Sequence, residues 1–147
     1  MSHPFYPGGN PKMNHVAMSL PADLLDEANR SDITHYFHEV FGFDELDMLT
    51  EDRHRLVLSC VHWDQFIFLI AEDEPMSCPR MDHYGFSVSS RAELDGVVDR
   101  AKAFREHDAR VDLIEPTVDD QGVVKIHSMY VAYLLPLMIE IQYWEFT

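Results

Sequence analysis

Two stretches decide the fold: His15-Val16-Ala17-Met18-Ser19 and His83-Tyr84-Gly85-Phe86-Ser87. Both contain a histidine, an apolar residue, a small residue, an apolar residue and a serine, in that order. Side chains alternate between the two faces of a strand, so each histidine shares a face with the small residue and the serine. The repeated pattern predicts that one structural unit occurs twice in the chain.

The first unit is predicted to occupy about residues 13–72. A strand at 13–20 is followed by the polar stretch 21–32 and by a helix that ends at Gly42. Three further strands are expected, at 43–49, 55–61 and 65–71. The order is therefore one strand, one helix and three strands.

The second unit is predicted to occupy about residues 81–145, after a separating segment that contains Pro75 and Pro79. It opens with a strand at 81–89, and Ser90-Arg91-Ala92-Glu93 has the pattern of a capping box that begins a helix. Strands are then expected at 110–114, 124–132 and 137–144.

Residues 1–12 are rich in Pro and Gly and are predicted to form a loose arm. The fold class is therefore α+β, with two βαβββ modules in one domain covering residues 13–147.

Composition limits the classes of function. The chain has 147 residues, of which 46% are hydrophobic and 12% aromatic, and this suits one globular domain. Its formal net charge of −15 argues against nucleic acid and membrane surfaces as partners. Cys60 and Cys78 have neither metal-type spacing nor a disulfide framework. Without a signal-peptide pattern or an apolar run of membrane-spanning length, a cytoplasmic location is expected.

The last predicted strand adds a carboxylate to the face that carries the histidines. Ile139, Ile141 and Tyr143 belong to its apolar face, so Glu140 is expected to point to the same side as His15 and His83. Two imidazoles and one carboxylate can bind a divalent first-row metal and leave positions open for a substrate. A buried Glu140 would also need a cation to offset the loss of its hydration.

Four motifs together resemble the vicinal oxygen chelate superfamily, which includes glyoxalases, extradiol dioxygenases and bleomycin-type resistance proteins. They are Asn14-His15-Val16, Tyr36-Phe37-His38-Glu39-Val40-Phe41-Gly42-Phe43, Asp82-His83-Tyr84-Gly85-Phe86-Ser87-Val88 and Met138-Ile139-Glu140-Ile141. The resemblance implies a half-open, eight-stranded mixed barrel with its helices outside. It also implies that His15, His83 and Glu140 are metal ligands and that two copies pair as a homodimer.

Within this superfamily, the ligand set is most similar to that of extradiol dioxygenases. Phe68 stands where glyoxalases have a fourth ligand, and Ser128-Met129-Tyr130 is similar to a segment whose Tyr lies beside the metal in the dioxygenases. The resemblance therefore implies Fe(II), with Mn, Ni or Zn as alternatives, and a catalytic role for Tyr130. The chain departs from the dioxygenase pattern at Phe68 and at Gln121, where active-site histidines would be expected, and at Leu134-Leu135-Pro136-Leu137, which replaces a usual turn.

Pocket-lining residues are predicted to be Phe68, Ser128, Met138, Gln142 and Trp144, a set that favours an aromatic or otherwise apolar ligand. We therefore predict an oxidoreductase of the extradiol dioxygenase type, acting on a small aromatic or vicinal-dioxygen substrate. Two alternatives stay open. One is a metal-free protein that binds a drug or metabolite, and the other is a lyase or isomerase of the glyoxalase type.

Overall fold

A computed structural model of the chain describes residues 11–49, 54–60, 62 and 64–147. In the first half, the elements are β1 (His15–Leu20), η1 (Ala22–Leu25), α1 (Glu27–Phe41), β2 (Asp44–Glu45), η2 (Asp47–Leu49), β3 (Arg55–Ser59) and β4 (Phe66–Ala71). In the second half, they are β5 (His83–Ser87), α2 (Arg91–His107), β6 (Asp112–Asp120), β7 (Val124–Ala132) and β8 (Met138–Phe146). The predicted order of strand, helix and three strands is confirmed in both halves. Most of the predicted arm, residues 1–10, lies outside the described residues, as does the end of the predicted strand 55–61.

The described strands form two four-stranded mixed sheets with the same topology. The strand orders are β1-β4-β3-β2 and β5-β8-β7-β6. In each sheet the first strand of the module pairs in parallel with the last, and the other pairs are antiparallel. The α+β class is therefore confirmed, but the described strands make two separate sheets and do not close into one barrel.

Both helices begin and end at identifiable capping residues. The Asp26 side chain accepts a hydrogen bond from the Asn29 backbone, so α1 begins at Glu27, inside the stretch that was predicted only as polar. Gly42 ends this helix with φ of 71°, as predicted. At α2, Ser90 accepts from the backbone of Glu93, as predicted, and the Glu93 carboxylate accepts from the backbone of Ser89 rather than from that of Ser90. None of the helices in the described part of the chain has the length and apolar character needed to cross a membrane.

Two predicted strands differ from the structure for local reasons. In the predicted strand 43–49, only Asp44 and Glu45 pair, and a 3₁₀ turn follows. The buried guanidinium of Arg30 holds Glu45 by an ion pair, which fixes the chain where the strand stops. Conversely, β6 continues to Asp120 because a register shift between Ile114 and Thr117 accommodates the proline between them without a ladder hydrogen bond.

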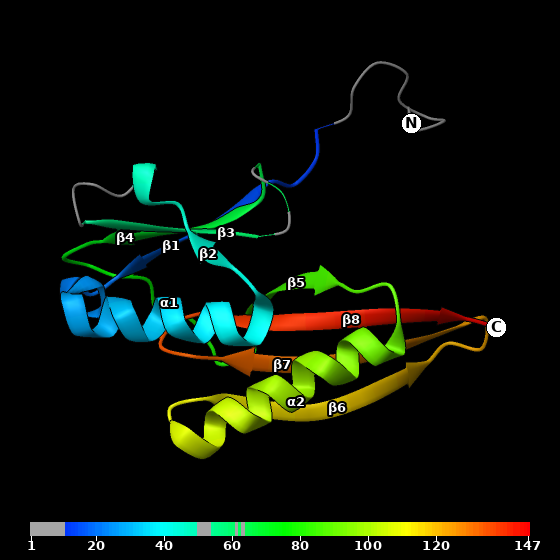
Figure 1. Ribbon diagram of the computed structural model, residues 1–147. Coiled ribbons are helices and arrows are strands. Elements are labelled where there is room, and N and C mark those ends of the chain that lie inside the picture. Colours follow the sequence, from blue (N-terminus) through cyan, green and yellow to red (C-terminus); the bar gives the residue numbers. More distant parts are fainter. Residues whose placement is uncertain (1–10, 50–53, 61, 63) are drawn as a thin grey trace.

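The helices lie on one side of each sheet, and the other side of each sheet remains open. In Figure 1, α1 runs along the sheet of the first module and α2 crosses the sheet of the second. The two helices also contact each other and share one apolar core, where Tyr36 of α1 stacks on Tyr133 at 4.4 Å between ring centroids. On the open sides, His15, His83 and Gly85 are exposed while their neighbours along the strand are more buried.

Candidate metal centre

Glu140 lies on the open face of the second sheet, in the middle of β8. It pairs with Gly85 of β5 and with Tyr130 of β7, so these three positions form a row across the sheet. Only 8% of Glu140 is exposed. A Cβ atom at position 85 would lie 3.8 Å from Glu140 Oε2, at ordinary van der Waals distance, so Gly85 is a direct neighbour of this oxygen.

The two oxygens of Glu140 have different partners. Oε1 accepts hydrogen bonds from Tyr130 Oη at 2.7 Å and from Gln142 Nε2 at 2.8 Å. Burial alone would raise the pKa of Glu140, but hydrogen bonds from Tyr130, Gln142 and Ser128, together with the charge of His83, lower it below its ordinary value. The hydrogen bond to Glu140, helped by burial, raises the pKa of Tyr130 to about 12. Glu140 is therefore held ionised, with Tyr130 as a protonated donor.

Oε2 of Glu140 faces His83. The His83 Nε2 atom lies 3.3 Å from Glu140 Oε2. The other ring nitrogen, Nδ1, is 2.7 Å from the carbonyl oxygen of Met81 and must donate to it, because a carbonyl can only accept. In the neutral imidazole, Nε2 therefore presents a lone pair to a carboxylate oxygen. A proton or a metal cation between the two atoms is needed to make this contact favourable.

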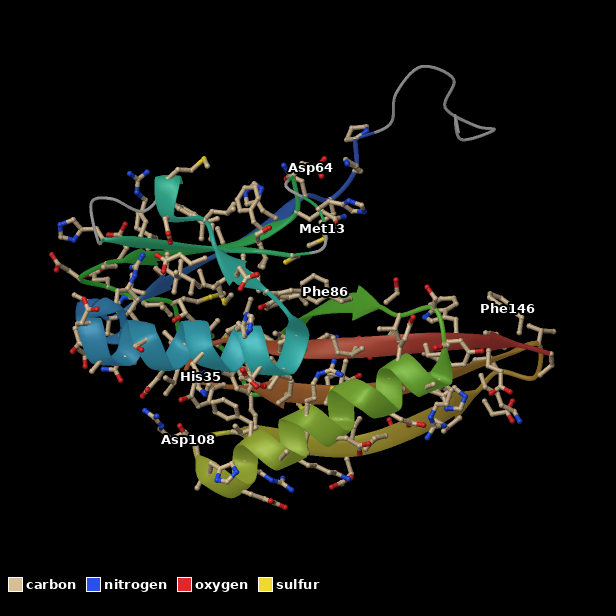
Figure 2. The ribbon with its side chains drawn as sticks, in the orientation of Figure 1. Met13, His35, Asp64, Phe86, Asp108 and Phe146 are labelled. Carbon is tan, nitrogen blue, oxygen red and sulfur yellow. The ribbon has the colours of Figure 1, made fainter. Side chains whose placement is uncertain are left out.

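His15 also has an oxygen atom beside its Nδ1 but lies on the other sheet. Its Nδ1 is 2.7 Å from Oδ1 of Asn14, which is compatible with an Nε2 without a proton in the neutral ring, and its ring stacks on Phe66 at 4.9 Å. His15 lines a cavity of about 270 Å³ together with residues 84–87 of β5. Two of the lining residues, Met13 and Phe86, are labelled in Figure 2.

The predicted convergence of three ligands does not occur within one chain. In the part of the chain that the structure describes, no three His, Cys, Asp or Glu side chains lie close enough to hold one ion. His83 and Glu140 come together, whereas His15 lines a cavity with residues 84–87 and does not form a three-ligand group with them. The physical reason is that the open faces of the two sheets do not close over each other.

The three predicted ligands nevertheless have the chemistry that a first-row divalent metal requires. The Met81 carbonyl fixes the His83 tautomer that offers Nε2 as a ligand. The contact of His15 Nδ1 with Asn14 Oδ1 is compatible with the same tautomer in His15. Glu140 is ionised, oriented by its hydrogen bonds and left with Oε2 on the side of His83. The donor set therefore fits a metal ion, provided that His15 is supplied from elsewhere.

The predicted pocket residues are divided between the two sheets. Ser128 and Gln142 share the open face with Glu140, and Trp144 follows on the same face with 47% of its surface exposed. Met138 is only 2% exposed, and Phe68 pairs with Ala17 on the first sheet.

Sequence reasoning did not assign roles to Asn14, Phe66 or Met81, which orient the two histidines. Asn14 stood in a quoted motif, but the contact with Phe66 depends on the pairing of β1 with β4.

Comparison with solved structures confirms the predicted resemblance at the level of the fold, which is that of the vicinal oxygen chelate proteins. A lactoylglutathione lyase from Agrobacterium tumefaciens matches with a TM-score of 0.61 and 15% identity, over 92% of this chain and 95% of that one. The fosfomycin resistance protein FosX from Listeria monocytogenes matches with a TM-score of 0.61 and 15% identity, over 90% and 91%. An integron cassette protein from the Halifax Harbour sewage outfall metagenome matches with a TM-score of 0.60 and 15% identity, over 89% of this chain and 97% of that one. No family model matches the chain, and no curated protein matches its sequence.

Proposed function

We propose that this protein is a divalent-metal-dependent enzyme that binds a small molecule through two adjacent oxygens. The observation that carries the proposal is the contact between Nε2 of His83 and Oε2 of Glu140, both of which are oriented by hydrogen bonds to their other ends. His83 is exposed on the open face of the sheet, so it does not contribute to packing of the apolar core. The two groups are therefore best explained as metal ligands.

The third ligand in this proposal is His15 of a second copy of the chain. His15 lies on the open face of the first sheet, and His83 and Glu140 lie on the open face of the second. A twofold arrangement that places the first sheet of one copy over the second sheet of the other would bring these faces together twice. The homodimer thus covers both open faces and completes two equivalent metal sites.

The residues around Glu140 have separate tasks in this proposal. A bound divalent metal supplies Lewis-acid chemistry that favours the deprotonated form of a substrate hydroxyl. Glu140 supplies the compensating negative charge through Oε2, and Tyr130 holds the carboxylate in place through Oε1. Although the single proton of its phenol is donated to Glu140, Tyr130 Oη can still accept a hydrogen bond from a substrate hydroxyl.

For the reaction, we propose oxygen-dependent cleavage of a catechol-type ring with Fe(II). Two histidines and one carboxylate on one side of the ion leave positions free for both a diol and O₂. A second argument concerns charge. Among the described strand positions of the second sheet that share a face with Glu140, there is no Lys or Arg, so this sheet by itself supplies no cation for a phosphonate or carboxylate group.

A second candidate reaction uses the same site without oxygen. The named neighbours include a lactoylglutathione lyase and a fosfomycin resistance protein, which favours a lyase or transferase chemistry with Ni, Mn or Zn. The described open face of the second sheet lacks basic side chains, but Arg55 shares the open face of the first sheet with Phe68, so this reaction is compatible with an anionic substrate. A protein that binds a drug or metabolite without any metal is the third possibility.

Reconstitution with individual metals separates these candidates. Chelator-treated protein is loaded anaerobically with Fe(II), Mn(II), Ni(II) or Zn(II) and then assayed for oxygen uptake with catechols, for turnover of a glutathione hemithioacetal and for modification of fosfomycin. We expect stoichiometric metal binding and oxygen uptake with Fe(II), and loss of both in Glu140→Gln. Glu74→Gln, in the exposed segment between the modules, is the matched control and should bind metal normally.

Each other outcome has a definite meaning. Metal binding with turnover only in the absence of oxygen consumption would replace the dioxygenase proposal with the second candidate. Wild-type protein that binds none of the four ions, with an unchanged melting temperature on their addition, would overturn the proposal of a metal enzyme.

A further inference from the structure

The open face of β8 carries a chain of hydrogen bonds that begins outside the metal centre. Glu140, Gln142 and Trp144 occupy alternate positions of this strand and therefore share one face. The indole Nε1 of Trp144 donates to Gln142 Oε1 at 2.9 Å. Nε2 of the same amide donates to Glu140 Oε1 at 2.8 Å.

This chain fixes the orientation of the Gln142 amide. An amide side chain can rotate by half a turn and exchange its oxygen and its NH₂ group. The indole N–H can only donate, so it requires the amide oxygen on its own side. The NH₂ group must then face Glu140, where the opposite orientation would place two oxygens against each other.

The orientation of Gln142 in turn decides which oxygen of Glu140 is free. With Gln142 and Tyr130 both donating to Oε1, Oε2 is the oxygen that faces His83. If the amide rotated, Oε1 would lose one of its donors and become available as a second ligand atom. Trp144 therefore influences the metal centre without touching it.

We propose that Trp144 is a positioning residue that, through Gln142, makes Glu140 a one-oxygen ligand of the metal. This inference rests on the proposed function, because it assigns a role toward the proposed ion. It differs from a role in lining the substrate pocket, since the indole N–H is already used by Gln142. A pocket role would affect substrate binding and leave the metal centre unchanged.

Three variants test this role. Trp144→Phe keeps an aromatic ring and removes the N–H donor, and Gln142→Met removes the amide at nearly constant length. Phe146→Leu is the control, because Phe146 follows on the same face of β8 and its described contact is a ring contact with Trp144. Co(II) affinity is measured by competition with a chelator, and the visible spectrum of the Co(II) protein reports the number of ligand atoms.

The relay predicts a specific pattern. Gln142→Met should weaken Co(II) binding about 10- to 100-fold, and Trp144→Phe about 3- to 10-fold, as expected for groups behind the ligands. The double variant should bind no more weakly than Gln142→Met alone, because both changes break the same chain. The Co(II) spectrum should change in Trp144→Phe and stay as in the wild type in Phe146→Leu.

Two results would overturn the inference while leaving the proposed function intact. One is wild-type affinity and an unchanged spectrum in Trp144→Phe, and the other is full additivity of the two single variants. Failure of the wild-type protein itself to bind Co(II) or any other divalent ion would instead overturn the proposed function and, with it, this role of Trp144.

Discussion

At the scale of single residues, the site depends on which polar atoms of Glu140, His83 and His15 are already hydrogen-bonded and which are available to a ligand. Each side chain has one polar atom fixed by a neighbour and one left available. Fixing one end of an imidazole or carboxylate lowers the entropy that must be lost when the other end binds a ligand. Orientation by neighbouring groups is therefore as important here as the identity of the ligands.

Removal of the Tyr130 hydroxyl should weaken metal binding directly. Tyr130→Phe takes away the hydrogen bond to Glu140 Oε1, and we expect divalent-metal affinity to fall about 10- to 100-fold. Isothermal titration with Mn(II) measures the change. Tyr143→Phe is a suitable control, because Tyr143 pairs with His127 and lies on the face of β8 opposite to Glu140. Equal affinity in Tyr130→Phe and wild type would show that Tyr130 does not support Glu140.

The sequence indicates the candidate ligand residues, but it does not indicate the groups that orient their side chains. His15, His83 and Glu140 stand at matching positions of repeated strands, which a period of two makes visible. The stacking of His15 on Phe66 depends on the register of the parallel pair β1 and β4, which are separated by a helix and two strands. The Met81 carbonyl is a backbone group, and no residue type indicates it.

At the scale of helices and strands, the capping residues make sharp predictions. Gly42 has φ of 71°, a left-handed conformation that costs a residue with a Cβ about 1–2 kcal/mol. Gly42→Ala should therefore lower the free energy of unfolding by about 1 kcal/mol, as measured by urea denaturation. Gly42→Asn should cost less, because Asn tolerates this conformation. An equal loss in both variants would contradict this explanation.

Element boundaries were predictable where a local signal exists and not where a tertiary contact decides. Ser90 and Gly42 mark helix ends through their own chemistry, and both predictions are confirmed. The early end of β2 follows from the ion pair between Arg30 and Glu45, which joins residues 15 positions apart. The extension of β6 past its proline follows from a bulge against β7, a feature of the pair rather than of either segment.

At the scale of the whole molecule, a network of charges connects the two modules. Arg110 Nη2 lies 2.6 Å from Asp108 and 2.7 Å from Asp32 of α1, and the Tyr133 hydroxyl donates to Asp108 at 2.7 Å. Hydrogen bonds from Arg110, and secondarily from Tyr133, hold the pKa of Asp108 well below its usual range despite partial burial. This network connects the end of α2 to α1.

The stability contributed by Asp108 should depend on pH in a defined direction. Because its pKa is lower in the folded state, its contribution is present above the ordinary pKa of an Asp and is lost as the pH falls through the lowered value. Asp108→Asn should therefore cost about 1–2 kcal/mol at pH 7 and progressively less in acid. Denaturation at several pH values tests this. Asp95→Asn, which removes only the exposed pair with Arg91 on α2, should cost about 0.3–0.5 kcal/mol. A cost for Asp108→Asn that does not vary with pH would contradict the assignment.

The order of elements in both modules and the α+β class could be predicted because each module repeats the same pattern of strands and helix. The arrangement of the two modules could not be predicted in the same way. It depends on the packing of α1 against α2, where Tyr36 meets Phe104 and Tyr133 from the other module. Side chains at such contacts follow no local periodicity, so the separation of His15 from Glu140 was not visible in the sequence.

The most direct test of the proposed metal centre mixes two inactive variants. His15→Ala and Glu140→Ala each remove one ligand from every site, so neither should bind a divalent metal alone. If His15 of one copy completes the site of the other, a 1:1 mixture that exchanges subunits should recover metal binding in about one quarter of the sites, because one site of each mixed dimer keeps all three ligands. Mixed samples that bind no more metal than the separate variants, although subunits exchange, would contradict the shared site.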